Sequence, residues 1–168
     1  MQNIQEYTLF IKASPEAIWE AWVSPEWSIR YGYAPVNHYE LRVGGKYEAT
    51  ANEGMKAIPG VPDVICDGEV LEVTKPFRLV QTWRMLMEPS LAAEGFTRLS
   101  FEIKPIRSGV CKVSLIHDLT NAPELAEMVS GKHIEHGAGG GWAEILSGLK
   151  TLLETGKQLP FLSGPEGC

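Results

Sequence analysis

One histidine lies where it could do chemistry inside the protein. His117 follows Cys111, Val113 and Leu115 at alternate positions, so these side chains share the apolar face of an expected strand over residues 110–119. An inward histidine could carry a proton or orient a ligand. The alternative interpretation is a core histidine whose ring nitrogens are satisfied by a backbone carbonyl or by water.

A second group of histidines has weaker support. His133 and His136 flank Glu135, a spacing that could bind zinc if the stretch were helical. The stretch lies in a polar segment next to glycines, without a nearby thiol or further histidine, which favours a solvated loop. His117 could complete a site only if this loop folded back, and we predict no metal site.

Two carboxylates occupy one expected strand, over residues 64–74. Glu69 and Glu72 lie on opposite faces, so one of them should point inward and meet a partner such as Arg84. We include Glu72 among the candidate ligand-binding residues. The sequence has no paired-carboxylate spacing and no nucleophile elbow, so it assigns no catalytic residue and no cofactor.

Aromatic and methionine side chains form the remaining candidates. Trp83, Met85 and Phe101 lie on strand faces that could look into a cavity, and Tyr31 and Tyr33 lie near its expected mouth. Such side chains adapt to apolar ligands and can offer a polar group. Plain core packing is the alternative for this set. It is the favoured interpretation for Trp19, Trp22 and Trp142.

The glycine-rich segment 137–141 precedes the last expected helix, which is a place where phosphates can bind. The dinucleotide fingerprint fails, because Trp142 stands at its third glycine position. We interpret the segment as a flexible start that lets the helix approach the sheet closely.

The elements that position these residues can be read from periodicity. Ser14-Pro15 and Ser24-Pro25 each combine a helix N-cap with a proline at the first helical position, which predicts two short helices, the second ending near Tyr31-Gly32. From residue 39 to 119 a period of two predicts strands joined in hairpins, the first turning at Gly44-Gly45. After a first strand over 7–12, the expected strands are 39–43, 46–52, 64–74, 78–87, 97–104 and 110–119.

The last element is a long amphipathic helix. It begins near Gly141-Trp142 and ends near Gly156, a good C′ residue. A sheet with one buried face needs a cover, and this helix is the one element long enough. The prediction is an α+β fold, one domain over residues 1–158 with a flexible tail over 159–168, and a gap between sheet and helix for a ligand. The expected buried stripe is Trp142, Ile145, Leu146, Leu149, Leu152 and Leu153.

Composition excludes several function classes. The formal net charge of −6 argues against nucleic acid or an anionic membrane as the main partner. No apolar run approaches the roughly 20 residues that span a bilayer, and no signal peptide is recognisable. Three widely spaced cysteines are not a disulfide framework, and Cys66 and Cys111 are expected in the core. A cytoplasmic location is the simplest expectation.

Several motifs carry a family resemblance over roughly residues 6–156. The chain resembles the SRPBCC or START-like superfamily, in its branch of activator of heat-shock-protein-90 ATPase homologues. The resemblance implies the helix-grip fold and a cavity for an apolar or amphipathic molecule. The motifs are Ser-Pro-Glu-Ala-Ile-Trp at 14–19, Gly-Glu-Val-Leu-Glu-Val at 68–73, Arg-Leu-Val-Gln-Thr-Trp at 78–83, Leu-Ile-His at 115–117 and Gly-Trp at 141–142.

The leading functional hypothesis is non-enzymatic binding of a small apolar or amphipathic molecule between sheet and helix. One alternative is a polyketide cyclase or dehydratase, which needs two titratable groups converging in the cavity. Another is an interaction protein in stress or chaperone biology. The eukaryotic chaperone activators have a separate N-terminal domain, whereas this chain begins directly at the first strand, so we expect no activation of a chaperone ATPase. A homodimer would cover edge strands of the sheet.

Overall fold

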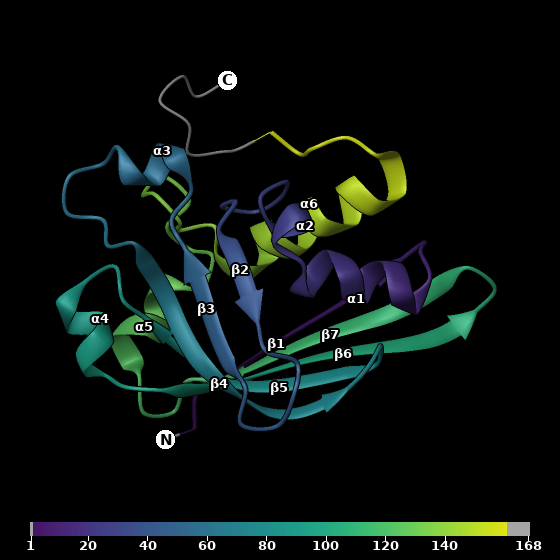
Figure 1. The fold of residues 1–168 in the computed structure, drawn as a ribbon, viewed down its shortest axis with the longest axis horizontal. Coiled ribbons are helices and arrows are strands. Elements are labelled where there is room, and N and C mark those ends of the chain that lie inside the picture. The colour runs from purple at the N-terminus through teal and green to yellow at the C-terminus, as the bar shows by residue number, and fades with distance from the viewer. Residues whose placement is uncertain (1, 161–168) are drawn as a thin grey trace.

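Seven strands pair into one antiparallel sheet in the order β1-β7-β6-β5-β4-β3-β2 (Figure 1). The structure is a computed structural model that describes residues 2–160. Consecutive strands from β2 to β7 are neighbours, and β1 pairs with β7, so β1 and β2 form the two edges. The strands are β1 (Ile4–Ile11), β2 (Val36–Tyr39), β3 (Lys46–Thr50), β4 (Val64–Thr74), β5 (Arg78–Met85), β6 (Thr97–Arg107) and β7 (Val110–Asp118).

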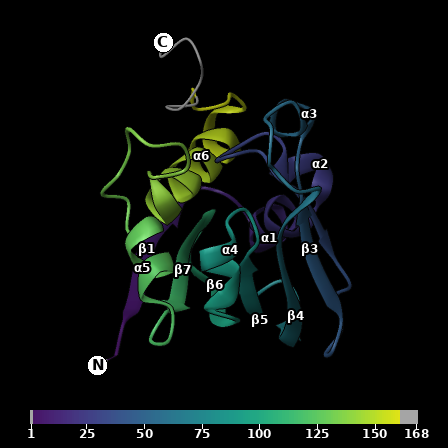
Figure 2. The ribbon, with the colours of Figure 1, turned by 90° about the vertical axis from the view of Figure 1, so that its left-hand side faces the viewer.

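The helices cover one face and one end of this sheet. The first helix and the last lie across the same face, while α4 and α5 sit at one end of the strands (Figures 1 and 2). The core therefore lies between the inner face of the sheet and this helical layer. The helices are α1 (Pro15–Val23), α2 (Pro25–Ser28), α3 (Glu53–Lys56), α4 (Pro89–Ala93), α5 (Pro123–Met128) and α6 (Gly141–Thr155).

The main predictions from periodicity are confirmed. Ser14 caps α1 by accepting a hydrogen bond from the Ala17 N–H at 3.2 Å. The alternating apolar residues of β6 and β7 face the core, which explains why these two strands were recognisable from sequence. The fold is the expected α+β helix-grip arrangement, with a curved antiparallel sheet beneath a long C-terminal helix.

The first predicted hairpin is wrong in its register. The strand expected at residues 39–43 is β2, Val36–Tyr39, and residues 40–45 form a connection instead. Arg42 N–H donates to Glu40 O, and Gly45 N–H donates to Arg42 O, each at 2.8 Å, which closes two turns in succession. Gly44 and Gly45 then bond to Val70 of β4. Leu41 and Val43 resemble strand residues in sequence, but both are exposed.

Other departures are short. The expected loop after β3 contains α3, the connection after β5 contains α4, and β5 ends at Met85 rather than at residue 87. The second helix, α2, ends at Ser28 rather than near Tyr31. These helices span four or five residues, too few for a periodic signal.

The last helix has the predicted bounds. Gly156 follows it in the left-handed conformation at φ 75° and closes it by donating to Leu152 O at 2.8 Å. Ile145 and Leu153 are only partly buried, whereas the rest of the predicted stripe is buried: Trp142, Leu146, Leu149 and Leu152. Gly148 is also buried, and it faces the backbone of Gly32, where a Cβ atom would stand 3.1 Å from the Gly32 nitrogen. The helix therefore approaches the segment after α2 closely.

Two further expectations concern the cysteines and the tail. Cys66 and Cys111 are free and buried, as expected for core residues. Residues 161–168 of the predicted tail lie outside the described residues. Within residues 2–160, no helix is long and apolar enough to cross a membrane.

The grip of α6 gives a first prediction. Replacing Leu149 by alanine removes a side chain with no exposed surface and should lower the free energy of unfolding by about 2–5 kcal/mol, since the cavity cannot fully collapse. Leu153→Ala in the same helix is the matched control and should cost clearly less, because Leu153 is partly exposed. Urea denaturation of both variants measures the difference, and equal losses would contradict the assigned face.

Candidate functional site

His117 joins the sheet to the last helix. Its side chain has no exposed surface. The Trp142 indole Nε1–H donates to His117 Nδ1 at 3.0 Å, so Nδ1 is the acceptor and the hydrogen of the neutral ring is assigned to Nε2. Nε2 lies 2.7 Å from Thr97 Oγ1, which in turn donates to the Trp83 carbonyl at 2.7 Å. A single chain of hydrogen bonds therefore runs from α6 through β7 and β6 to β5.

This histidine is neutral at physiological pH. Burial lowers the pKa of His117 to about 3, and the neighbouring Asp118 opposes the shift only weakly. Both ring nitrogens are already bonded to side chains. His117 is thus a satisfied core histidine, although its partners are Thr97 and Trp142 rather than the carbonyl or water expected from sequence.

Aromatic rings surround this hydrogen-bond chain. Trp22 of α1 stacks on Phe101 of β6, with ring centroids 4.0 Å apart. Trp142 lies 6.4 Å from Trp22 and 5.6 Å from Trp83, and Trp83 packs edge-on against His117 at 5.4 Å. We call Trp22, Trp83, Phe101, His117 and Trp142 the aromatic cluster. It unites the predicted Trp83, Phe101 and His117 with two tryptophans that the sequence had assigned to plain core.

A second group of polar aromatic side chains lies beside the cluster. The Tyr39 hydroxyl donates to Gln81 Oε1 at 2.7 Å, and the rings of Tyr39 and Tyr47 stack 4.6 Å apart. The Tyr31 hydroxyl donates to the Ala21 carbonyl at 2.8 Å. Burial raises the pKa of all three tyrosines, so they keep their protons. We call Tyr31, Tyr39, Tyr47 and Gln81 the tyrosine group.

Tyr31 is the one member of the tyrosine group that the sequence predicts as a site residue. Tyr39 was placed at the start of a misplaced strand, and Gln81 looked like an ordinary polar residue of β5. The signal available was their parity, because Gln81 pairs with Leu99 and Tyr39 pairs with Tyr47 on the inner face. Predicted Met85 lies nearby, with its Sδ 3.9 Å from Cys66 Sγ.

Two indole groups inside the protein lack partners. Among the described residues, the buried Nε1 atoms of Trp19 and Trp22 have no hydrogen-bond acceptor. The Trp22 N–H faces the Tyr39 hydroxyl without reaching hydrogen-bond geometry. A buried donor without an acceptor costs about 1–3 kcal/mol, so its presence asks for an explanation.

Tyr33 lies where α6 and the segment that follows α2 pack together. Its hydroxyl donates to Glu144 Oε2 at 2.6 Å, which ties the two segments together. Burial and the Glu144 carboxylate both raise the pKa of Tyr33. The sequence placed Tyr33 near the mouth of a cavity but gave no sign of Glu144 as its partner.

Glu72 does not point inward, which corrects the expectation from simple alternation. A bulge in β4 shifts the register between Val70 and Glu72. Glu72 is therefore exposed on the outer face of the sheet, where it pairs with Arg78 at 3.0 Å and Arg98 at 3.5 Å. Glu69 is exposed as well, so neither carboxylate reaches the interior.

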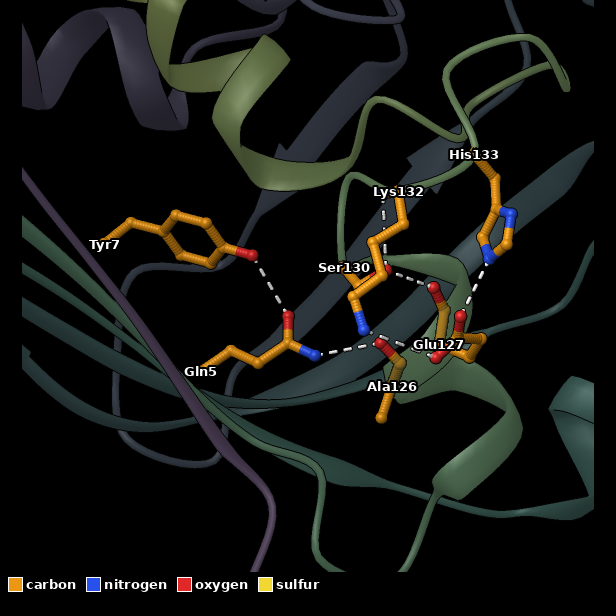
Figure 3. Close-up of polar contacts among 7 residues, drawn as sticks. All are labelled: Gln5, Tyr7, Ala126, Glu127, Ser130, Lys132 and His133. Carbon is orange, nitrogen blue, oxygen red and sulfur yellow. Dashed lines mark hydrogen bonds and ion pairs between the residues drawn. The ribbon is translucent and has the colours of Figure 1, made fainter.

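The histidine-rich loop is bonded to α5. Figure 3 shows His133 turned toward Glu127 at the end of α5, with a distance of 2.8 Å between Nε2 and Oε1. α5 is tied to β1 where the Gln5 amide donates to the Ala126 carbonyl at 2.8 Å (Figure 3). Among the described residues, no three histidine, cysteine or carboxylate side chains could hold a metal ion together. The solvated-loop interpretation is therefore supported.

The glycines after this loop serve close packing. Gly141 has φ 62°, and a Cβ atom there would stand 2.2 Å from the Val129 carbonyl. The close approach at Gly141 is therefore to the loop backbone after α5, and the flexible start predicted for the helix stays a prediction.

Aromatic and tyrosine side chains lie between the sheet and α6, where the sequence predicts a cavity. The members of the aromatic cluster and the tyrosine group are buried there, apart from Tyr39, which is partly buried. Two of the best-formed hollows in the described part of the chain lie elsewhere. One of about 230 Å³ adjoins Ser14, Arg107 and Cys111, and one of about 200 Å³ adjoins His38 and Lys46.

Comparison with known proteins identifies the relatives of this arrangement. Residues 12–154 match the family model described as activator of Hsp90 ATPase homolog 1-like protein. No curated protein matches the chain.

Solved structures share the fold at low sequence identity. A protein from Cytophaga hutchinsonii is 20% identical with a TM-score of 0.64, covering 91% of this chain and 94% of the other. The Aha1 dimer from Colwellia psychrerythraea is 20% identical with a TM-score of 0.61, covering 92% and 98%. An HSP90 activator from Plasmodium falciparum is 17% identical with a TM-score of 0.60, covering 90% and 96%.

The buried histidine predicts a particular pH dependence. Its pKa in the folded chain lies below its ordinary value of 6.5, so the unfolded chain binds a proton first as the pH falls. The contribution of His117 to the free energy of unfolding should be fully present above pH 6.5. It should be lost as the pH falls toward 3, by at most about 1.4 kcal/mol per pH unit.

His117→Gln should flatten this slope between pH 6.5 and 4, because glutamine does not titrate. His133→Gln is the control and should keep the wild-type slope, since His133 lies in the exposed loop. Urea denaturation across the pH series measures both variants. Identical slopes in the wild type and His117→Gln would contradict a neutral buried imidazole.

Proposed function

Because the chain belongs to the family of activator of Hsp90 ATPase homolog 1-like proteins, we propose that it binds a small apolar or amphipathic molecule between its sheet and α6. The molecule would lie against the aromatic cluster, with polar groups of the cluster and the tyrosine group fixing its orientation. Binding, rather than a reaction, is the function that this geometry supports best.

The composition of the interior supports the proposal. A core that only stabilised the fold would gain most from aliphatic side chains without polar atoms. This interior instead combines three indoles, an imidazole, tyrosine hydroxyls and the Gln81 amide within one layer. Flat aromatic surfaces with a few convergent polar groups are typical of small-molecule sites.

The single observation that carries the proposal is the unpaired N–H of Trp22. It is buried, it adjoins Tyr39 and the Phe101 ring, and it has no acceptor in the described structure. A ligand oxygen placed there would supply the missing hydrogen bond. A ligand at this position would have to displace the Trp22 ring from Phe101, on which it stacks without any hydrogen bond from its N–H.

The enzymatic alternative has less support. A cyclase or dehydratase needs an acid and a base that converge on one substrate carbon. Of the described residues, His117 is the buried histidine, and both of its nitrogens are engaged. The carboxylates lie outside the aromatic cluster, and no observation favours this alternative. The chaperone-related role and the homodimer stay predictions, as do the cytoplasmic location and the extent of the domain.

The proposal predicts binding of a neutral apolar dye. Nile red should bind the purified chain with a stoichiometry of one, and its fluorescence should rise as it leaves water. Phe101→Leu should weaken binding by about fivefold or more, because it removes the ring on which Trp22 stacks. Native mass spectrometry of protein purified from its source should also show a co-purified small molecule.

Phe96→Leu is the matched control for this experiment. Phe96 is exposed and lies beneath Arg84 on the outside of the sheet, with the guanidinium carbon 4.3 Å from its ring centroid. This variant should bind Nile red as the wild type does. The proposal fails if folded wild-type protein neither takes up the dye nor carries a molecule, or if both variants lose binding equally.

A further inference from the structure

The charged side chains lie outside the core of the molecule. Among residues 2–160, the buried polar side chains include no aspartate, glutamate, lysine or arginine. Across the inner face, one row of paired residues runs from Val70 through Gln81, Leu99 and His117 to Gln5. Its polar members are two amides and an imidazole. The interior therefore offers hydrogen bonds but no formal charge.

The outer face of the same strands is heavily charged. Arg78 reaches both Glu72 and Glu102, and Arg84 makes a two-point contact with Asp67 at 3.0 and 2.7 Å. These ion pairs cross neighbouring strands in the solvent-exposed layer. These charged side chains therefore lie on the outer face of the sheet and cannot pair with a ligand bound against the inner face.

The ionisable groups that do lie inside are held neutral. Burial lowers the pKa of His117 and raises the pKa of the tyrosines and of the Cys66 thiol. None of them changes charge between pH 5 and 8. A ligand carboxylate or ammonium group would find no counter-charge there at physiological pH.

The contact between α6 and the segment after α2 carries a negative charge. Glu144 stands in the first turn of α6 and accepts the hydrogen bond of Tyr33. An anion that entered between these two segments would meet the Glu144 carboxylate before it reached the interior. This arrangement disfavours anionic ligands in addition to the cost of burying their charge.

We propose that the site takes an uncharged ligand with an oxygen acceptor, such as a ketone, ester or ether, which binds the Trp22 N–H, and that it rejects carboxylates and amines of the same shape. The inference rests on the proposed function and names its ligand class. The Trp22 N–H is the specificity-determining group, because it is the unpaired donor within the aromatic cluster. The Tyr39 hydroxyl lies beside it and could accept a hydrogen bond from a ligand hydroxyl.

A matched set of naphthalenes tests the proposal by isothermal titration calorimetry at pH 7. The set is 2-acetylnaphthalene, 2-isopropylnaphthalene, 2-naphthoate and 2-naphthylmethylammonium. They share one ring system and differ in the acceptor or the charge. The ketone should bind about tenfold more tightly than the hydrocarbon, the gain expected for satisfying one buried donor. Both ions should bind at least about a hundredfold more weakly than the ketone.

Trp22→Phe removes the donor while keeping an aromatic ring. The ketone should lose its advantage over the hydrocarbon in this variant, while the ions stay weak. Trp27→Phe is the control, because Trp27 is partly exposed beneath Arg30 and should keep the wild-type order. Thermal unfolding checks that each variant is folded, and the wild-type series decides the charge selection by itself if Trp22→Phe is not.

The outcomes separate this inference from the function beneath it. If none of the four compounds and no Nile red binds, the proposed function fails. If naphthoate or the ammonium compound binds as tightly as the ketone, binding stands and the inference is overturned. If the ketone keeps its advantage in folded Trp22→Phe, the assignment of the acceptor to Trp22 is overturned.

Discussion

The hydrogen bond between Trp142 and His117 is the interaction on which the arrangement of the interior depends. It joins the buried stripe of α6 to the sheet by a directional polar contact, whereas Lys150 of the same helix bonds the Phe10 carbonyl of β1 from an exposed position. Apolar packing tolerates sliding and rotation, whereas an N–H···N bond of 3.0 Å fixes both position and orientation. Thr97 extends the constraint to β6 and, through the Trp83 carbonyl, to β5.

That constraint explains why the imidazole has to stay neutral. A protonated His117 would carry a hydrogen on Nδ1 and could no longer accept from the Trp142 indole. The exclusion of water has two effects here. It disfavours the charged form of His117, and it strengthens the hydrogen bond from Trp142. The residue that looked most like an acid–base catalyst in sequence is therefore used to connect helix and sheet. The candidate binding surface is built around it by Trp22, Phe101 and Trp83.

The two faces of the sheet differ in charge. The inner face holds neutral polar groups among aromatic rings, and the outer face holds networks of arginine and glutamate. The bulge after Val70 keeps this division intact, because it moves Glu72 to the outer face. Without it, strict alternation would have placed one carboxylate of β4 inside an otherwise uncharged layer, at a large desolvation cost.

The sequence by itself determined the elements whose burial follows a regular period: α1 with its Ser14 cap, β6, β7 and the whole of α6 to Gly156. These depend on local rules of capping and on a face that is buried along its full length. Only the tertiary structure decided the rest. Whether Glu72 points inward depends on a bulge, which has no periodic signature. Whether Trp22 and Trp142 only pack the core or also form part of a site depends on contacts between rings of elements more than a hundred residues apart. Alternation along β7 shows that His117 points inward. Its hydrogen-bond partners come from β6 and α6, so its surroundings and its neutral state could not be predicted from that alternation.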